Sequence, residues 1–323
     1  MDRSRGEADL RQTITKTQNR RTHNGLVALP SIRPGGTISF VSPASPLEAG
    51  KLAHITELLE GEGYRVRLMP HALDADAHLA GSDLDRARDL TDAFLDPEID
   101  GVLCTRGGYG CARLLPYLDL DALAATGKWF GGFSDITTLH LALNRRGLPT
   151  WHAPMALTLH FEREPWVYAS LFSALKGIPL FPVEAPRGKI FVHGDAEGEI
   201  TGGCLCLVCD SLATSESIDC TGKLVLIEDV DEAPHRIDAM LTHLLNAGQL
   251  QRAAAILFGE MTRTDERTDE GIGGKPWREI VRERTADLGI PVAIDLPFGH
   301  CRNMLTIPWG VRAAWREGRL ETL

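Results

Sequence analysis

Short apolar runs alternate with amphipathic stretches between residues 35 and 152. The apolar runs predict strands at Thr37–Ser42, Tyr64–Met69, Ile99–Cys104, Trp129–Gly132 and Leu148–Trp151. Between them, apolar residues recur at helical spacing and predict helices at Leu47–Glu62, from Ser82 onward, near Cys111–Tyr117 and at Ile136–Arg145. This alternation is typical of a parallel, Rossmann-like sheet with helices on both faces, in which ligands bind at the carboxyl ends of the strands.

The alternation is interrupted between residues 161 and 187, where prolines and acidic residues predict a partly helical linker. Strands are predicted again at Lys189–His193, Gly198–Thr201, Leu224–Ile227 and Ala254–Phe258, with helices at Leu205–Ala213, Pro234–Asn246 and Trp277–Asp287. The chain is therefore expected to contain an N-terminal extension (1–32), an N-terminal α/β domain (33–160), the linker, and a mixed α/β, strand-rich C-terminal domain (188–323).

The composition is that of an ordinary globular protein, with 323 residues, 43% hydrophobic and 24% charged. A formal net charge of −10 argues against nucleic acid or an anionic membrane as the partner. No apolar run approaches the roughly 20 residues that a membrane-spanning helix needs. The basic N-terminus lacks the apolar core of a signal peptide, so residues 1–25 are interpreted as a disordered tail and a cytoplasmic location is expected.

Seven cysteines form an odd set that suits a reducing compartment. Three of them, Cys204, Cys206 and Cys209, lie close enough in sequence to suggest a metal site. Apolar residues separate them and no fourth ligand stands at a convincing spacing. Buried small side chains are the favoured interpretation, and no metal is expected.

Ser134 lies where the strand Trp129–Gly132 gives way to a predicted helix. At such a corner a serine hydroxyl is exposed beside the free N–H groups of the helix start, which can stabilise a developing oxyanion. The corner lacks the second glycine of the G-x-S-x-G pattern, so an α/β-hydrolase is not indicated. The alternative interpretation is that Ser134 simply caps the helix.

A glycine-rich turn, Thr105-Arg-Gly-Gly-Tyr-Gly110, follows another predicted strand. Its backbone could cradle a phosphate, although the spacing is not that of a dinucleotide fold and no Walker lysine follows. It could equally form the second wall of an oxyanion hole, or be a plain tight turn.

A serine nucleophile needs a base and an orienting acid. Among eleven histidines, His300 is favoured because it follows a glycine in a turn of the second domain. His140 and His243 lie on helical faces and are expected to pack, and His152 is a secondary candidate. Glu228 ends an apolar strand and is the candidate for the orienting acid. A carboxylate that is half-buried there must be paired or hydrogen-bonded. The alternative is that Glu228 only caps the strand or forms a local salt bridge with Arg236.

Four segments, in this order, closely resemble the LD-carboxypeptidases, serine peptidases also called muramoyltetrapeptide carboxypeptidases. They are Thr105–Gly110, Gly131-Gly-Phe-Ser-Asp-Ile-Thr137, Leu226-Ile-Glu-Asp-Val-Asp-Glu-Ala-Pro-His-Arg-Ile-Asp238 and Pro297-Phe-Gly-His300. The resemblance spans about Arg33 to Val311, and a sister branch of the family contains the microcin-immunity peptidases.

The resemblance implies a triad of nucleophile Ser134, base His300 and orienting acid Glu228, formed where two domains meet. It also implies an oxyanion hole from the backbone N–H of Asp135 and that of Gly107 or Gly108. The implied substrate is a murein tetrapeptide, cut between meso-diaminopimelate and the terminal D-Ala without a cofactor, by a homodimer. Such a substrate ends in a carboxylate, for which Arg106, Arg236 and Arg302 are candidates.

Three alternatives remain open from the sequence. The protein could be an immunity-type peptidase acting on peptidyl or aminoacyl nucleotides, or a non-catalytic module that binds muropeptides. It could also be a nucleotide-binding α/β enzyme that uses Gly107–Gly110.

Overall fold

The N-terminal half is built on a six-stranded sheet in the order β11-β5-β4-β3-β1-β2. We describe it from a computed structural model that covers residues 29–269, 271 and 273–323. The predicted extension therefore lies outside the described residues except for 29–32. The first five strands of the chain are parallel to one another. They are β1 (Thr37–Val41), β2 (Arg65–Leu68), β3 (Gly101–Cys104), β4 (Trp129–Gly132) and β5 (Thr150–His152).

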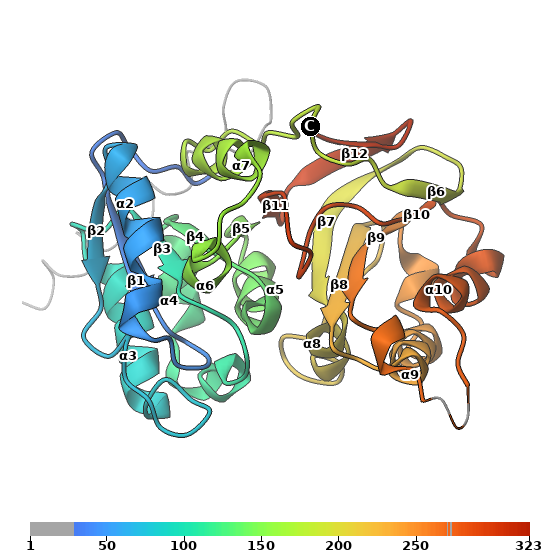
Figure 1. The fold of residues 1–323 in the computed structure, drawn as a ribbon, viewed down its shortest axis with the longest axis horizontal. Coiled ribbons are helices and arrows are strands. Elements are labelled where there is room, and N and C mark those ends of the chain that lie inside the picture. Colours follow the sequence, from blue (N-terminus) through green and yellow to red (C-terminus); the bar gives the residue numbers. More distant parts are fainter. Residues whose placement is uncertain (1–28, 270, 272) are drawn as a thin grey trace, which may run out of the picture.

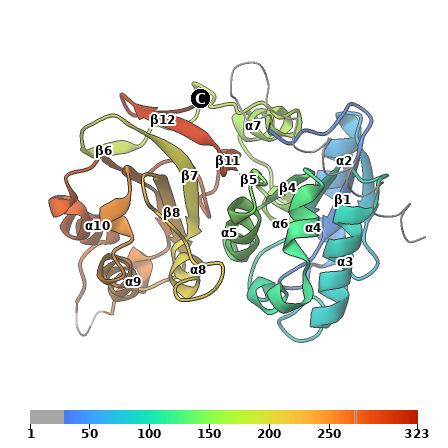
Figure 2. The same cartoon turned by 180° about the vertical axis from the view of Figure 1, so that it is seen from behind.

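Helices cover both faces of this sheet, as predicted. Helices α2 and α6 lie in front of it in Figure 1, and α3 and α4 lie in front in the reverse view of Figure 2. The helices of this half are α2 (Ala53–Gly61), α3 (Asp83–Leu95), α4 (Leu120–Ala125), α5 (Thr137–Arg145), α6 (Ala156–Leu159) and, within the predicted linker, α7 (Pro165–Leu175). Ser82 caps α3 by accepting a hydrogen bond from the backbone N–H of Asp85.

One predicted helix of this half is replaced by two short turns. The segment near Cys111–Tyr117 forms single 3₁₀ turns at Cys111–Arg113 and Leu115–Tyr117. Pro116 lacks a backbone N–H and disfavours the helical conformation of the residue before it, which explains why no continuous α-helix forms.

The C-terminal half carries a seven-stranded mixed sheet in the order β13-β12-β7-β8-β9-β10-β6. Its central strands β7 (Ala196–Cys204), β8 (Leu224–Val230), β9 (Ala255–Thr262) and β10 (Val292–Ile294) are parallel. The outer strands β6 (Lys189–Val192), β12 (Arg312–Arg316) and β13 (Arg319–Thr322) are antiparallel. The helices are α8 (Leu205–Asp210), α9 (Pro234–Asn246) and α10 (Trp277–Thr285). The predicted mixed, strand-rich architecture is thus present.

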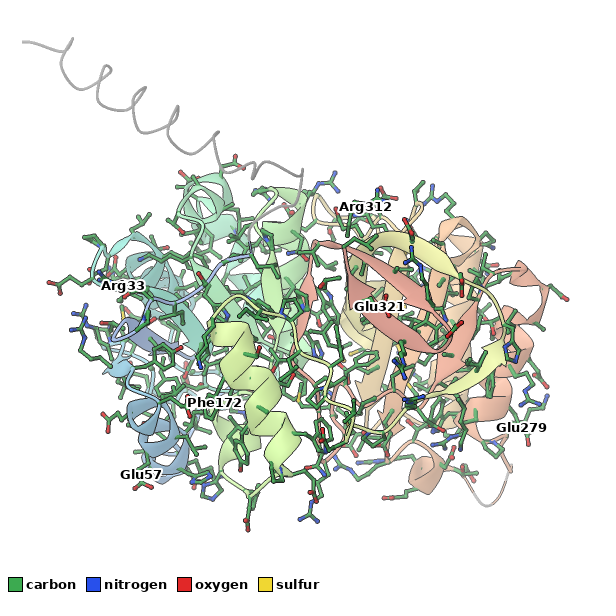
Figure 3. The ribbon with its side chains drawn as sticks, turned by 90° about the horizontal axis from the view of Figure 1, so that it is seen from above. Arg33, Glu57, Phe172, Glu279, Arg312 and Glu321 are labelled. Atoms are coloured by element: carbon green, nitrogen blue, oxygen red, sulfur yellow. The ribbon has the colours of Figure 1, made fainter. Side chains whose placement is uncertain are left out.

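The two halves are joined through strand β11 (Ile307–Trp309). Short strands with turns were predicted from Pro291 on, but not the partner of this one. Although it lies late in the chain, β11 pairs antiparallel with β5 and becomes the sixth strand of the N-terminal sheet. A hydrophobic cluster continues across the junction and includes Trp151, Trp309 and Trp315. Figure 3 shows this arrangement from above, with Phe172 on α7 and with Arg312 and Glu321 on β12 and β13.

A direct contact also links the start of α5 with the end of β7. The hydroxyl of Thr137 accepts a hydrogen bond of 3.1 Å from the backbone N–H of Cys204. The carboxyl ends of β4, β7 and β8 consequently lie near one another. Among the described residues, none of the helices has the length and apolar character needed to span a membrane.

Candidate active site

Ser134 occupies the predicted strand-to-helix corner. It follows β4 and Phe133 and begins a 3₁₀ turn, Ser134–Ile136, that continues into α5. Its φ of +66° lies in the left-handed region, which is strained for a residue with a side chain. The cap positions of the turn and of α5 are held by Phe133 and Ile136, without side-chain cap bonds. The capping interpretation is therefore not supported, and the hydroxyl is free for another contact.

That contact is with His300. The Nε2 atom of His300 lies 3.0 Å from the Ser134 hydroxyl oxygen. On the other side of the ring, Nδ1 lies 2.6 Å from Oε2 of Glu228, which also accepts a hydrogen bond of 3.2 Å from the His300 backbone N–H. Three residues distant in the sequence thus form one hydrogen-bonded chain, the arrangement in which a serine, a base and an orienting acid act together.

Burial and charge act in opposite directions on this pair. Glu228 is fully buried. Burial alone would raise the pKa of Glu228, but the positive charge and hydrogen bonds of His300 lower that pKa instead. Burial alone would lower the pKa of His300, yet the Glu228 carboxylate raises it above its ordinary value. The site therefore stabilises an imidazolium, which a general base must become during the reaction.

Two backbone features direct the Glu228 side chain toward His300. The pairing of β8 with β9 shifts register between Ile227 and Asp229, so Glu228 lies at an irregularity, of the kind that redirects side chains. Gly299, just before His300, has a φ of +89°, and a Cβ there would lie 2.4 Å from the Glu228 carboxylate. A glycine is required at this position both for the conformation and for the space.

The glycine-rich turn after β3 packs against the serine. A Cβ on Gly107 would lie 2.7 Å from the Cβ of Ser134 and 3.2 Å from the backbone nitrogen of Asp135. Gly108 instead faces Ser45, whose Oγ would be 2.2 Å from an added Cβ. The two predicted components of an oxyanion hole, the Asp135 amide and the Gly107–Gly108 turn, therefore border Ser134.

The segment that follows β1 supports this turn through two residues that sequence reasoning missed, Ser42 and Ser45. The hydroxyl groups of Ser42 and Thr105 are 2.5 Å apart, and Ser45 accepts a hydrogen bond of 3.2 Å from the backbone N–H of Tyr109. The order of strands reverses between β1 and β3, where ligands bind in such sheets. Ser42 and Ser45 were a detectable signal, because Ser42 ends a predicted strand and Ser45 stands three residues after it.

The Asp135 side chain has a separate, structural role. It is buried and accepts a hydrogen bond of 2.8 Å from the backbone N–H of Cys111. Burial raises the pKa of this carboxyl. The backbone nitrogen of Asp135 lies beside the Gly107 turn, and the Asp135 side chain anchors the segment after the glycine-rich turn.

The three candidate arginines lie in different surroundings. Arg106 donates to the carbonyl groups of Gly107 and Pro46, and Arg236 forms an ion pair with Glu232 at 3.7 Å. Arg302, two residues after His300, makes no ion pair within the described ranges. Arg163 is a neighbour of Arg302. Burial of Arg163, and secondly the positive charge of Arg302, lower the pKa of Arg163.

His140 packs as predicted, whereas His243, which was also expected to pack, lies exposed on α9. His152, the secondary candidate, is buried as well. His140 is buried, with one ring nitrogen 2.8 Å from the Thr150 hydroxyl and the other 2.8 Å from the Gly132 carbonyl. His152 stacks on Trp309 with ring centroids 4.8 Å apart. Burial lowers the pKa of His152 to about 3, so it remains neutral. Glu228 is bonded to His300, and Arg236 is paired elsewhere, so the alternative salt bridge does not form.

Comparisons with known proteins identify the family of this chain. Residues 38–153 match the LD-carboxypeptidase N-terminal domain, and residues 197–314 match the LD-carboxypeptidase C-terminal domain. The chain is 38% identical to a putative carboxypeptidase of Streptomyces coelicolor, over 89% of this chain and 93% of that protein. It is 31% identical to the murein tetrapeptide carboxypeptidase of Pseudomonas aeruginosa, over 88% and 95% of the two chains.

Solved structures have the same fold. The muramoyltetrapeptide carboxypeptidase from Oxalobacter formigenes superposes with a TM-score of 0.75 at 25% identity, covering 88% of this chain and 97% of that one. The microcin C7 self-immunity protein, in complex with aspartyl sulfamoyl adenosine, superposes with a TM-score of 0.80 at 21% identity, covering 91% and 98%. This chain belongs to the LD-carboxypeptidase family of serine peptidases.

Proposed function

We propose that this protein is a serine carboxypeptidase that hydrolyses the bond between meso-diaminopimelate and the terminal D-Ala of murein tetrapeptides. The observation that carries the proposal is the continuous chain of contacts from Ser134 through His300 to Glu228, beside the Gly107–Gly108 turn. The names of relatives that cover nearly the whole chain support the substrate. In this proposal the enzyme acts on recycled cell-wall peptides in the cytoplasm.

The reaction follows from the positions of these groups. His300 takes the Ser134 proton at Nε2 as the hydroxyl oxygen attacks the carbonyl carbon of the scissile bond. The tetrahedral oxyanion is stabilised by the Asp135 amide and the Gly107–Gly108 turn. His300 then donates the proton to the leaving D-Ala nitrogen, and water releases the acyl group by the same route. Glu228 accepts a hydrogen bond from Nδ1 of His300 throughout, which orients the ring and stabilises the imidazolium.

The substrate itself is tested by incubating the purified enzyme with murein tetrapeptide and measuring the release of D-Ala. A peptidyl adenylate analogue, assayed in parallel, distinguishes the immunity-type activity. Faster turnover of the nucleotide would contradict the murein assignment. Binding of tetrapeptide without turnover would indicate a non-catalytic module, and thermal stabilisation by ATP or NAD would indicate a nucleotide-binding enzyme.

Replacing Gly107 with alanine tests the oxyanion hole. The added methyl would collide with Ser134 and displace the turn, and loss of one oxyanion donor typically lowers kcat by about 10²–10³-fold. Gly50→Ala is the control, because no atom lies within 4 Å of a Cβ at that position. Unchanged kcat in Gly107→Ala, measured by D-Ala release, would exclude this turn from the hole.

Arg302 is proposed to bind the terminal carboxylate of the substrate. Losing a hydrogen bond to a charged group should raise KM by about tenfold to hundredfold in Arg302→Gln. Arg236→Gln is the control, since Arg236 is already paired with Glu232. Equal KM values in the two variants would assign carboxylate binding to other residues, such as Arg106.

The homodimer implied by the family resemblance stays a prediction, which light scattering of the purified protein would test.

A further inference from the structure

The end of β7 and the end of β8 bring two thiols and a carboxylate together. The sulfur atoms of Cys204 and Cys206 are 3.4 Å apart, and the Cys204 sulfur lies 3.5 Å from Oδ1 of Asp229. One ligand atom from each of the three residues lies within 4.8 Å of the other two. This cluster adjoins the catalytic site but contains none of the residues that carry the proposed reaction.

The cluster differs from the set of three cysteines that the sequence suggested. Cys209 turns away and donates through its thiol to the Met240 carbonyl at 3.4 Å. Asp229 takes its place from a distant part of the chain. The other carboxylate oxygen of Asp229 accepts a hydrogen bond of 2.9 Å from the Cys206 backbone N–H, so the carboxylate is held in position.

The spacing fits a small tetrahedral cation. Zinc binds thiolate sulfur at about 2.3 Å and carboxylate oxygen at about 2.0 Å, so tetrahedral geometry separates two sulfurs by about 3.8 Å and a sulfur from an oxygen by about 3.5 Å. The measured 3.4 Å and 3.5 Å are close to these values. Only small side-chain movements are needed for all three atoms to reach one ion.

The surroundings favour positive charge. Cys204 is paired in register with Glu228, so a second buried carboxylate, that of Glu228, lies beside the carboxylate of Asp229 in the cluster. Cys206 is partly exposed and offers an approach from solvent.

We propose that Cys204, Cys206 and Asp229 form a binding site for a thiophilic divalent cation of the zinc class. Three protein ligands leave one tetrahedral position for water or another small ligand. Each thiol binds as a thiolate, so two protons are released to solvent for each ion bound. A bound cation would lie beside Glu228 and weaken the electrostatic interaction of that carboxylate with the His300 imidazolium. On the proposed function, occupancy therefore inhibits hydrolysis.

The test is a cadmium titration of the reduced, full-length protein, followed by the ultraviolet absorption of the cadmium–thiolate bond and by competition with zinc. We expect one ion per chain. Cys206→Ser should weaken binding by at least about tenfold and remove most of the absorption, since it removes a ligand outright. Cys209→Ser is the matched control and should bind like the wild type.

The outcomes separate this site from the proposed function. Ser134→Ala should bind cadmium with unchanged affinity, so the site can be established whether or not the enzyme cleaves murein peptides. Absence of the thiolate absorption, or equal binding by Cys206→Ser and the wild type, would overturn the proposal. A Cys204–Cys206 disulfide that forms in air, with no cation bound after reduction, would overturn it as well. Circular dichroism of each variant verifies that it is folded.

Discussion

Ser134→Ala is expected to lower kcat by about a millionfold, the loss seen when a hydroxyl nucleophile is removed from a triad of this kind. The variant lacks the hydroxyl oxygen that lies 3.0 Å from Nε2 of His300. Alanine carries the same Cβ in the same left-handed conformation, so the fold should be retained. The measurement is the single-turnover rate of D-Ala release, with thermal unfolding in parallel.

Ser39→Ala is the matched control for this prediction. Ser39 is a buried serine of β1 whose hydroxyl donates to the Gly101 carbonyl at 3.4 Å, away from the proposed nucleophile. Its replacement should leave kcat within a few-fold of the wild type. Substantial turnover by Ser134→Ala, in a protein whose circular dichroism is unchanged, would remove Ser134 from its role.

Glu228→Gln is expected to lower kcat by about 10⁴-fold, as when the orienting acid of a serine triad becomes an amide. It should also move the pH profile. The carboxylate raises the pKa of His300 above its ordinary value, which is about 6.5. Because the base must be neutral to accept a proton, kcat/KM of the wild type should rise with pH through a midpoint above 6.5. Without the Glu228 carboxylate the lowering effect of burial on the pKa of His300 is opposed mainly by the charge of Asp229, and the midpoint should fall.

A second buried glutamate serves as the control for this experiment. Glu216, which follows α8, is also buried and forms an ion pair at 2.8 Å with Arg146, at the opposite end of α5 from Ser134. Glu216→Gln should reduce thermal stability and leave the midpoint of the pH profile where it was. If both variants shifted the midpoint alike, Glu228 would have no specific influence on His300.

The sequence predicted most elements because their apolar periodicity is a local property. The five parallel strands of the N-terminal sheet were placed within two residues of their observed ends, and α9 was placed at its observed bounds. The exceptions also have local physical causes, such as Pro116 in the interrupted helix. Strand β11 was not predicted as a partner of β5, because three residues carry too little pattern to reveal which strand they join.

Ser134, Glu228 and His300 could be nominated from the sequence because each stands at the end of an apolar run or after a glycine. Short-range sequence thus determined the elements and the residue types that chemistry requires at their ends. Only the tertiary structure decided which ends meet. The contact of Gly107 with Ser134 and the exchange of Cys209 for Asp229 join residues far apart in the chain. Such contacts arise from the order of the strands within each sheet, with β3 beside β4 and β7 beside β8, which no local pattern encodes.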